Sequence, residues 1–151
     1  MTPQQEPKKK TILLVCSYNS VRSQIAEGLI RHYFGDRFTV DSAGIAPAGL
    51  NPRSVRVMAE IGIDISKQRS KSIQEFDGRG FDYLIILCAH ARTAVNPTLP
   101  KGKQILFRGF ESPDEMFEDE EKVLAEFRSL RDEMKEWLLE TFSSGPEKAQ
   151  Q

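Results

Sequence analysis

The feature that most limits the possible folds of this sequence is a short apolar run, which is followed by a polar loop and then by a helical pattern. Residues 11–15 read TILLV, residues 16–23 read CSYNSVRS, and residues 24–30 read QIAEGLI. An uninterrupted apolar run of this length is typical of a central parallel strand that is covered on both faces. A strand that passes through a tight loop into a helix begins a βαβ unit, so this segment favours folds with a parallel sheet.

The rest of the chain continues the alternation of strands and helices. Helical patterns run from about Arg22 to Phe34, after Pro52, and along a long final segment. The expected strands are Ile12–Val15, Phe38–Asp41, Tyr83–Leu87 and Ile105–Phe107. The apolar stripe of the final helix consists of Val123, Phe127, Leu130, Met134, Trp137 and Thr141. This order predicts an α/β fold with a parallel sheet, in which a binding site lies at the carboxyl ends of the strands.

Length and charge set the domain organisation and the expected compartment. The 151 residues suit one domain, which we place at 11–142 between flexible tails at 1–10 and 143–151. A formal net charge of −1 gives no electrostatic reason to expect nucleic acid or membrane as a partner. The sequence contains no apolar run of membrane-spanning or signal-peptide length. We therefore expect a cytoplasmic protein.

Cysteine and histidine are scarce. The chain has two cysteines, Cys16 and Cys88, which in a reducing compartment are more often chemical than structural. His32 and His90 are isolated in the sequence and are interpreted as surface or packing residues. Because no cluster has the spacing of metal ligands, we expect no bound metal.

The loop after the first strand is suited to binding a tetrahedral oxyanion such as arsenate or a phosphate ester. Backbone N–H groups of such a loop can converge on an anion, and the following helix adds free N–H groups and a partial positive charge. Arg22 can donate two parallel hydrogen bonds to the anion. The expected oxyanion-binding residues are Ser17, Tyr18, Asn19, Ser20, Val21 and Arg22.

The same surroundings favour the thiolate form of Cys16, which makes it the expected nucleophile. Ser23 can donate a hydrogen bond to the sulfur, and Asn19 can adopt the positive φ that a tight loop requires. A Cys-x5-Arg match alone is a weak signal, and the alternative is a buried cysteine followed by an arginine at a helix start. The strand before the loop, the helix after it and Ser23 beside Arg22 favour the catalytic interpretation.

These residues resemble the phosphate-binding loop of the low-molecular-weight protein tyrosine phosphatases, and more closely that of the thioredoxin-coupled arsenate reductases built on the same fold. The resemblance extends from about Thr11 to Trp137 and includes DSAGIAPAGLNPRSV, IGIDISKQRSKSI, LIILCAHA and RGFESPDE. It implies a single domain with a four-stranded parallel sheet and helices on both faces. It also implies that Cys16 is the nucleophile, that Cys88 is a second redox thiol, and that no cofactor is bound. The reductant would be an external thiol: thioredoxin, glutathione or mycothiol.

The chain departs from this family pattern at several positions. Val95 is near the place where the reductases carry a third cysteine, so a relay of three cysteines is impossible. Ser112 replaces the aspartate that precedes proline in the acid loop, which leaves Glu111 and then Asp114 as the candidate general acids. Lys71 falls where some reductases carry an acidic residue near a bound potassium ion. The lysine could replace that cation, or it could be a solvated surface lysine, which is the favoured interpretation.

Three functions are compatible with the sequence. The first is an arsenate reductase in which Cys16 attacks arsenate and a second thiol, Cys88 in the favoured version, releases arsenite. The second is a phosphatase acting on phosphotyrosine or a small phosphate ester, which needs a carboxylic acid such as Glu111 or Asp114 to protonate the leaving oxygen. The third is a non-catalytic oxyanion sensor. The reductase is favoured because the second cysteine is in place and the acid of the phosphatases is not.

Overall fold

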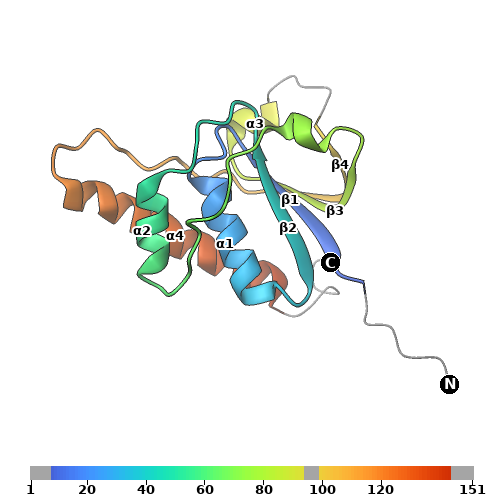
Figure 1. Ribbon diagram of the computed structural model, residues 1–151, viewed down its shortest axis with the longest axis horizontal. Coiled ribbons are helices and arrows are strands. Elements are labelled where there is room, and N and C mark those ends of the chain that lie inside the picture. The colour runs from blue at the N-terminus through green and yellow to red at the C-terminus, as the bar shows by residue number, and fades with distance from the viewer. Residues whose placement is uncertain (1–7, 94–98, 144–151) are drawn as a thin grey trace.

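The computed structural model describes residues 8–93 and 99–143, so Val95 lies outside the described residues. Four parallel strands form one sheet in the order β2-β1-β3-β4 (Figure 1). The strands are β1 (Lys10–Cys16), β2 (Phe38–Gly44), β3 (Gly80–Ile86) and β4 (Lys101–Phe107). Every crossover between them brings the next strand back in the same direction, which confirms the predicted α/β class.

The helices lie on both sides of this sheet. They are α1 (Arg22–Phe34), α2 (Pro52–Ala59), α3 (Ala89–Thr93) and α4 (Glu120–Phe142), with a short 3-10 turn η1 (Ile73–Phe76). Helices α1 and α4 cover one face, α2 packs against α4, and η1 and α3 lie on the other side (Figure 1). None of the helices in the described part of the chain is both long and apolar enough to cross a membrane.

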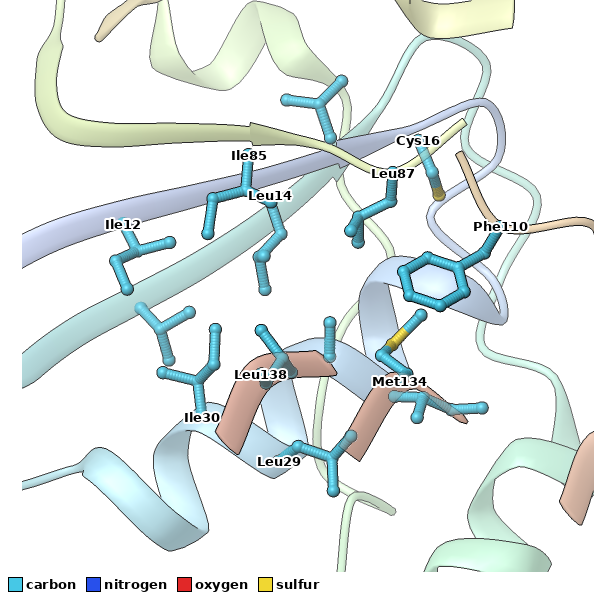
Figure 2. Close-up of a cluster of buried hydrophobic side chains, with 14 of the residues drawn as sticks. Ile12, Leu14, Cys16, Leu29, Ile30, Ile85, Leu87, Phe110, Met134 and Leu138 are labelled. Atoms are coloured by element: carbon cyan, nitrogen blue, oxygen red, sulfur yellow. The ribbon is translucent and has the colours of Figure 1, made fainter. Parts of the chain in front are cut away.

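The core lies between the sheet and helices α1 and α4. Figure 2 shows Ile12, Leu14 and Ile85 of the sheet facing the helical side chains. The helical side of this cluster includes Leu29, Ile30, Met134 and Leu138. The stretch from Ile12 to Val15 is 0% exposed, because β1 has a neighbouring strand on each side and a covered surface on both faces. The continuous apolar run therefore marked the central strand, as predicted.

The predicted elements agree with the structure in kind and differ at their ends. Helix α1 has the predicted bounds, whereas β4 begins at Lys101 instead of Ile105. As the edge strand, β4 alternates exposed and half-buried residues, and Ile105 is 61% exposed. The sequence of β4 therefore has no long apolar run by which its start could be predicted. The first strand begins at Lys10, inside the predicted tail, and α4 ends at Phe142. Neither α3 nor η1 was predicted, because five and four residues are too few for a helical period.

Candidate functional site

Cys16 is the last residue of β1, whereas the sequence predicted a strand that ends at Val15 and a loop that begins at Cys16. Its side chain is buried, with 1% exposed. The Sγ atom lies 2.9 Å from Oγ of Ser23 and accepts a hydrogen bond from the backbone N–H of Asn19 at 3.3 Å. Cys16 therefore lies within hydrogen-bonding distance of two polar groups, and its role as the nucleophile stays a prediction.

The loop that follows has its carbonyl groups turned away from its centre. The carbonyl oxygens of Cys16, Ser17, Tyr18 and Ser20 accept hydrogen bonds from the N–H groups of Ile45, Ala46, Ala48 and Asn51, at 2.8 to 3.2 Å. Within residues 8–93 and 99–143, the N–H groups of Ser17, Tyr18, Ser20 and Val21 donate to no protein acceptor. Helix α1 begins at Arg22 without a side-chain cap. Unpaired N–H groups in a tight loop and at a helix start are the donors that an oxyanion site needs, so oxyanion binding at this loop stays a prediction.

Asn19 fixes the shape of this loop from below. It is the residue with positive φ that the sequence predicted, at 47°, and it is fully buried. Its Nδ2 group donates to Oγ of Ser23 at 2.7 Å and to Oγ of Ser42 at 2.8 Å. Its Oδ1 accepts the N–H of Lys71 at 2.6 Å. One amide side chain therefore joins the loop, α1, β2 and the segment before η1.

Gly44 allows this close packing. A Cβ atom at Gly44 would lie 2.7 Å from the backbone nitrogen of Asn19 and 2.9 Å from the carbonyl carbon of Tyr18. Both atoms belong to the backbone and cannot turn aside. The end of β2 can therefore support the loop only because this residue has no side chain.

Lys71 is buried, and its interpretation as a solvated surface lysine is wrong. It is 7% exposed, its Nζ donates to the carbonyl of Arg69 at 2.9 Å, and it lies 3.7 Å from Oε1 of Glu27. The same Glu27 oxygen accepts the hydroxyl of Ser42 at 2.5 Å. Nearby, burial raises the pKa of Asp41, while the ammonium of Lys71 acts in the opposite direction. The site thus contains a buried ion pair behind the loop.

The arginine of the loop is half-buried and linked to the expected acid loop. Nη1 of Arg22 donates to the carbonyl of Phe110 at 3.2 Å. The adjacent Glu111 is exposed and makes no hydrogen bond or ion pair in the described residues. Asp114 is also exposed, and its Oδ1 accepts the N–H of Met116 at 2.9 Å. The acid loop therefore reaches the site through its backbone, and the choice of a general acid stays a prediction.

Cys88 follows β3 at the same edge of the sheet as Cys16, as expected for neighbouring parallel strands. The N–H of Leu87 donates to the carbonyl of Val15 at 2.9 Å, which aligns the two strand ends. Cys88 is 2% exposed, and its Sγ lies 3.3 Å from Oγ of Ser17 and 3.3 Å from the N–H of Ala91. Both cysteines are free. The second thiol therefore contacts the residue next to the nucleophile.

His90 also lies at this site, although the sequence did not predict it. Its Nδ1 lies 3.0 Å from Oγ of Ser17. The signal available in the sequence was its position, two residues after Cys88 and just beyond a strand end. Because α3 is short and was not predicted, the direction of this side chain could not be inferred.

Comparisons with known proteins agree with this geometry. Residues 11–140 match the family model described as low molecular weight phosphotyrosine protein phosphatase. The arsenate reductase of Halalkalibacterium halodurans is 43% identical over 126 residues, which cover 83% of this chain and 90% of that protein. A solved structure described as an arsenate reductase in the phosphate binding state superposes with a TM-score of 0.74 at 30% identity, covering 89% of this chain and 98% of that one. A thioredoxin-dependent arsenate reductase of Corynebacterium glutamicum has a TM-score of 0.60 at 26% identity, covering 86% of this chain and 60% of that one.

Proposed function

Since the chain belongs to the low molecular weight phosphotyrosine protein phosphatase family, we propose that it is an arsenate reductase in which Cys16 and Cys88 act in sequence. The observation that carries this proposal is the second buried thiol, whose Sγ lies 3.3 Å from the hydroxyl of Ser17 in the oxyanion loop. In a phosphatase the same thiol would be a packed core cysteine with no part in the reaction. Relatives at about 40% identity that are named arsenate reductases support the same choice.

The first step forms a bond between sulfur and arsenic. Arsenate binds to the free N–H groups of the loop and to Arg22, which offset the negative charge of its oxygens. The thiolate of Cys16 attacks the arsenic atom, and one arsenate oxygen leaves as water after it takes up protons. The hydroxyl of Ser23 and the N–H of Asn19 hold the sulfur in place for this attack.

The second step reduces the arsenic. The thiolate of Cys88 attacks Sγ of Cys16, a disulfide forms, and the bond between sulfur and arsenic breaks. Its electron pair stays on the arsenic, which leaves as arsenite, while the two sulfurs are oxidised. A disulfide requires the two Cα atoms to lie within about 7 Å, and Cys16 and Cys88 follow paired residues of the adjacent strands β1 and β3.

An external dithiol then restores the two cysteines. Thioredoxin is the proposed reductant, since a disulfide between two protein cysteines is its usual substrate class and one structural neighbour is described as thioredoxin-dependent. Glutathione or mycothiol would instead take the arsenic adduct directly from Cys16. Either reductant fits a cytoplasmic protein, where reducing conditions keep both cysteines free.

A phosphatase is the second candidate, and the family description favours it. The contact from Arg22 to the carbonyl of Phe110 ties the anion site to the loop that would supply the acid. Glu111 is the first candidate for that acid and Asp114 the second. On an ester with a poor leaving group, Glu111→Gln or Asp114→Asn should slow turnover if either carboxyl is the acid.

The assay that separates these functions uses arsenate and para-nitrophenyl phosphate, each with thioredoxin and then with glutathione. If the protein is an arsenate reductase, we expect sustained arsenite production with thioredoxin and loss of that turnover in Cys88→Ser. Sustained ester hydrolysis without arsenate reduction would establish the phosphatase instead. If the protein binds arsenate but forms neither arsenite nor the hydrolysed ester, both enzyme functions are wrong and an oxyanion sensor is the function that fits.

A further inference from the structure

The hydroxyl of Ser17 lies between a thiol and an imidazole. Its Oγ is 3.3 Å from Sγ of Cys88 and 3.0 Å from Nδ1 of His90. Cys88 and Ser17 are buried, at 2% and 4% exposed, whereas His90 on α3 is exposed to solvent. A hydroxyl can accept one hydrogen bond while it donates another. The three groups therefore form a continuous path for a proton from a buried sulfur to the surface.

We propose that Cys88, Ser17 and His90 form a proton relay that converts Cys88 into the thiolate that attacks Cys16. This inference rests on the proposed reductase function and identifies His90 as a positioning residue for its second step. The thiol of Cys88 donates to Oγ of Ser17, and the hydroxyl of Ser17 donates to Nδ1 of a neutral His90. When the proton moves along this path, a thiolate and an imidazolium remain, bridged by the serine hydroxyl.

The relay completes the proton balance of the reduction. As Cys88 attacks, the new bond joins its sulfur to that of Cys16 and the bond from Cys16 to arsenic breaks with both electrons on arsenic. The proton that Cys88 gives up resides on His90 and passes to solvent, since the imidazole is exposed. Without an acceptor, a buried thiol would have to release this proton into an apolar surrounding, which burial disfavours.

Two further groups on α3 lie near the relay. The N–H of Ala91 donates to Sγ of Cys88 at 3.3 Å and favours the thiolate, but it cannot accept the proton. Arg92, two residues after His90 on the same helix, has its guanidinium 4.4 Å from the ring centroid of Phe107 on β4. Cys16, at the end of the neighbouring strand β1, is another titratable group at this edge of the sheet, and the test below removes it.

The test isolates Cys88 by its ultraviolet thiolate absorbance in a Cys16→Ser background. The chain has two cysteines, so this variant retains Cys88 as the sole thiol, and Cys16→Ser/Cys88→Ser supplies the baseline. Titration of the background is compared with the same protein carrying His90→Gln, or His32→Gln as the matched control. His32 is the other histidine, and it is exposed on α1.

If the relay operates, His90→Gln should move the midpoint of the Cys88 thiolate titration upward by about one pH unit. At a fixed pH below the midpoint, this is about a tenfold loss of thiolate. His32→Gln should leave the midpoint in place. Equal midpoints in the His90→Gln and His32→Gln proteins would overturn the relay. A reciprocal measurement does not depend on the glutamine variant: the proton magnetic resonance titration of the His90 ring should shift when Cys88→Ser is added to the background. An unchanged His90 titration would also count against the relay.

This design separates the relay from the proposed function, because the absorbance titration needs no arsenate. If the unmodified protein does not reduce arsenate, the reductase proposal fails even where the midpoint shifts. If it does reduce arsenate, His90→Gln should slow disulfide formation in a single turnover by about tenfold near neutral pH and lose that deficit at alkaline pH. A deficit that is the same at every pH would indicate a structural role for His90 and would overturn the relay.

Discussion

The ammonium of Lys71 lies 3.7 Å from Oε1 of Glu27, and both side chains are buried behind the oxyanion loop. The pair is connected to the catalytic sulfur through hydrogen bonds. Glu27 accepts from Ser42, Ser42 accepts from the amide of Asn19, and the same amide donates to Ser23, whose Oγ lies 2.9 Å from Sγ of Cys16. A charge at the back of the site therefore supports the shape of the loop at its front.

Replacing the lysine should loosen this support. We expect Lys71→Met to lower the free energy of unfolding by about 1–3 kcal/mol, because it removes a partner from a buried carboxylate. Urea unfolding measures this loss. Lys67→Met is the matched control, since Lys67 is an exposed lysine of the same segment, and it should change stability little. Equal stability of the two variants would mean that the buried pair contributes nothing.

The loop arginine should act through the shape of its guanidinium and not only through its charge. We expect Arg22→Lys to lower kcat for arsenate about a hundredfold or more while the protein still folds, since lysine cannot donate two parallel hydrogen bonds. Steady-state kinetics and circular dichroism check both parts. Arg56→Lys, at an exposed position on α2, is the control. Kinetics close to those of the unmodified protein would exclude Arg22 from the oxyanion site.

Gly44 should be required for oxyanion binding. In Gly44→Ala the new methyl group would meet the backbone of Asn19 at 2.7 Å, so the loop must move away from β2. We expect weaker phosphate binding by calorimetry and a loss of about 1–3 kcal/mol in stability. Gly80→Ala is the control, because no atom lies within 4 Å of a Cβ built there. Unchanged phosphate affinity in Gly44→Ala would show that the loop does not need this contact.

The ion pairs between α2 and α4 should make stability depend on acid pH. Hydrogen bonds from Arg128, and then from Arg131, lower the pKa of Glu60 from 4.5 to about 2. The folded state therefore holds the deprotonated carboxyl more strongly than the unfolded state does. Its contribution is fully present above pH of about 4.5 and is lost as the pH falls towards about 2.

Thermal melting at pH 7 and at pH 3 tests this dependence. We expect the difference between the two melting temperatures to shrink in Glu60→Gln. Glu118→Gln is the control, since Glu118 is exposed and makes no ion pair in the described residues. If the difference in melting temperature between pH 7 and pH 3 is unaltered in Glu60→Gln, other carboxyl groups cause the loss of stability in acid.

The sequence was sufficient where one local segment determines the structure. The apolar run before Cys16, the helix from Arg22 and the left-handed conformation of Asn19 all depend on neighbours in the chain, and each was predicted. Lys71 was not predicted correctly, because its burial arises from contact with Glu27, which lies far away in the sequence. His90 was missed for a similar reason, since Ser17 reaches it across two strand ends.

The acid loop shows the other limit of the sequence. Its link to the site is a carbonyl group, that of Phe110, and a backbone contact leaves no trace in residue type. The exposed positions of Glu111 and Asp114 depend on the path of the whole segment between β4 and α4. Side-chain chemistry alone could therefore name candidates for the acid but could not choose between them.

If the chain is an arsenate reductase, Cys16 and Cys88 together supply the two electrons that reduce arsenate to arsenite. The direct measurement is peptide mapping by mass spectrometry after the reduced protein meets one equivalent of arsenate with no added thiol, followed by an alkylating quench. We expect one equivalent of arsenite and a peptide in which Cys16 and Cys88 are joined by a disulfide, with neither product in Cys88→Ser. Arsenite formed while both cysteines carry the alkyl label, or no arsenite until an external thiol caps Cys16, would contradict it.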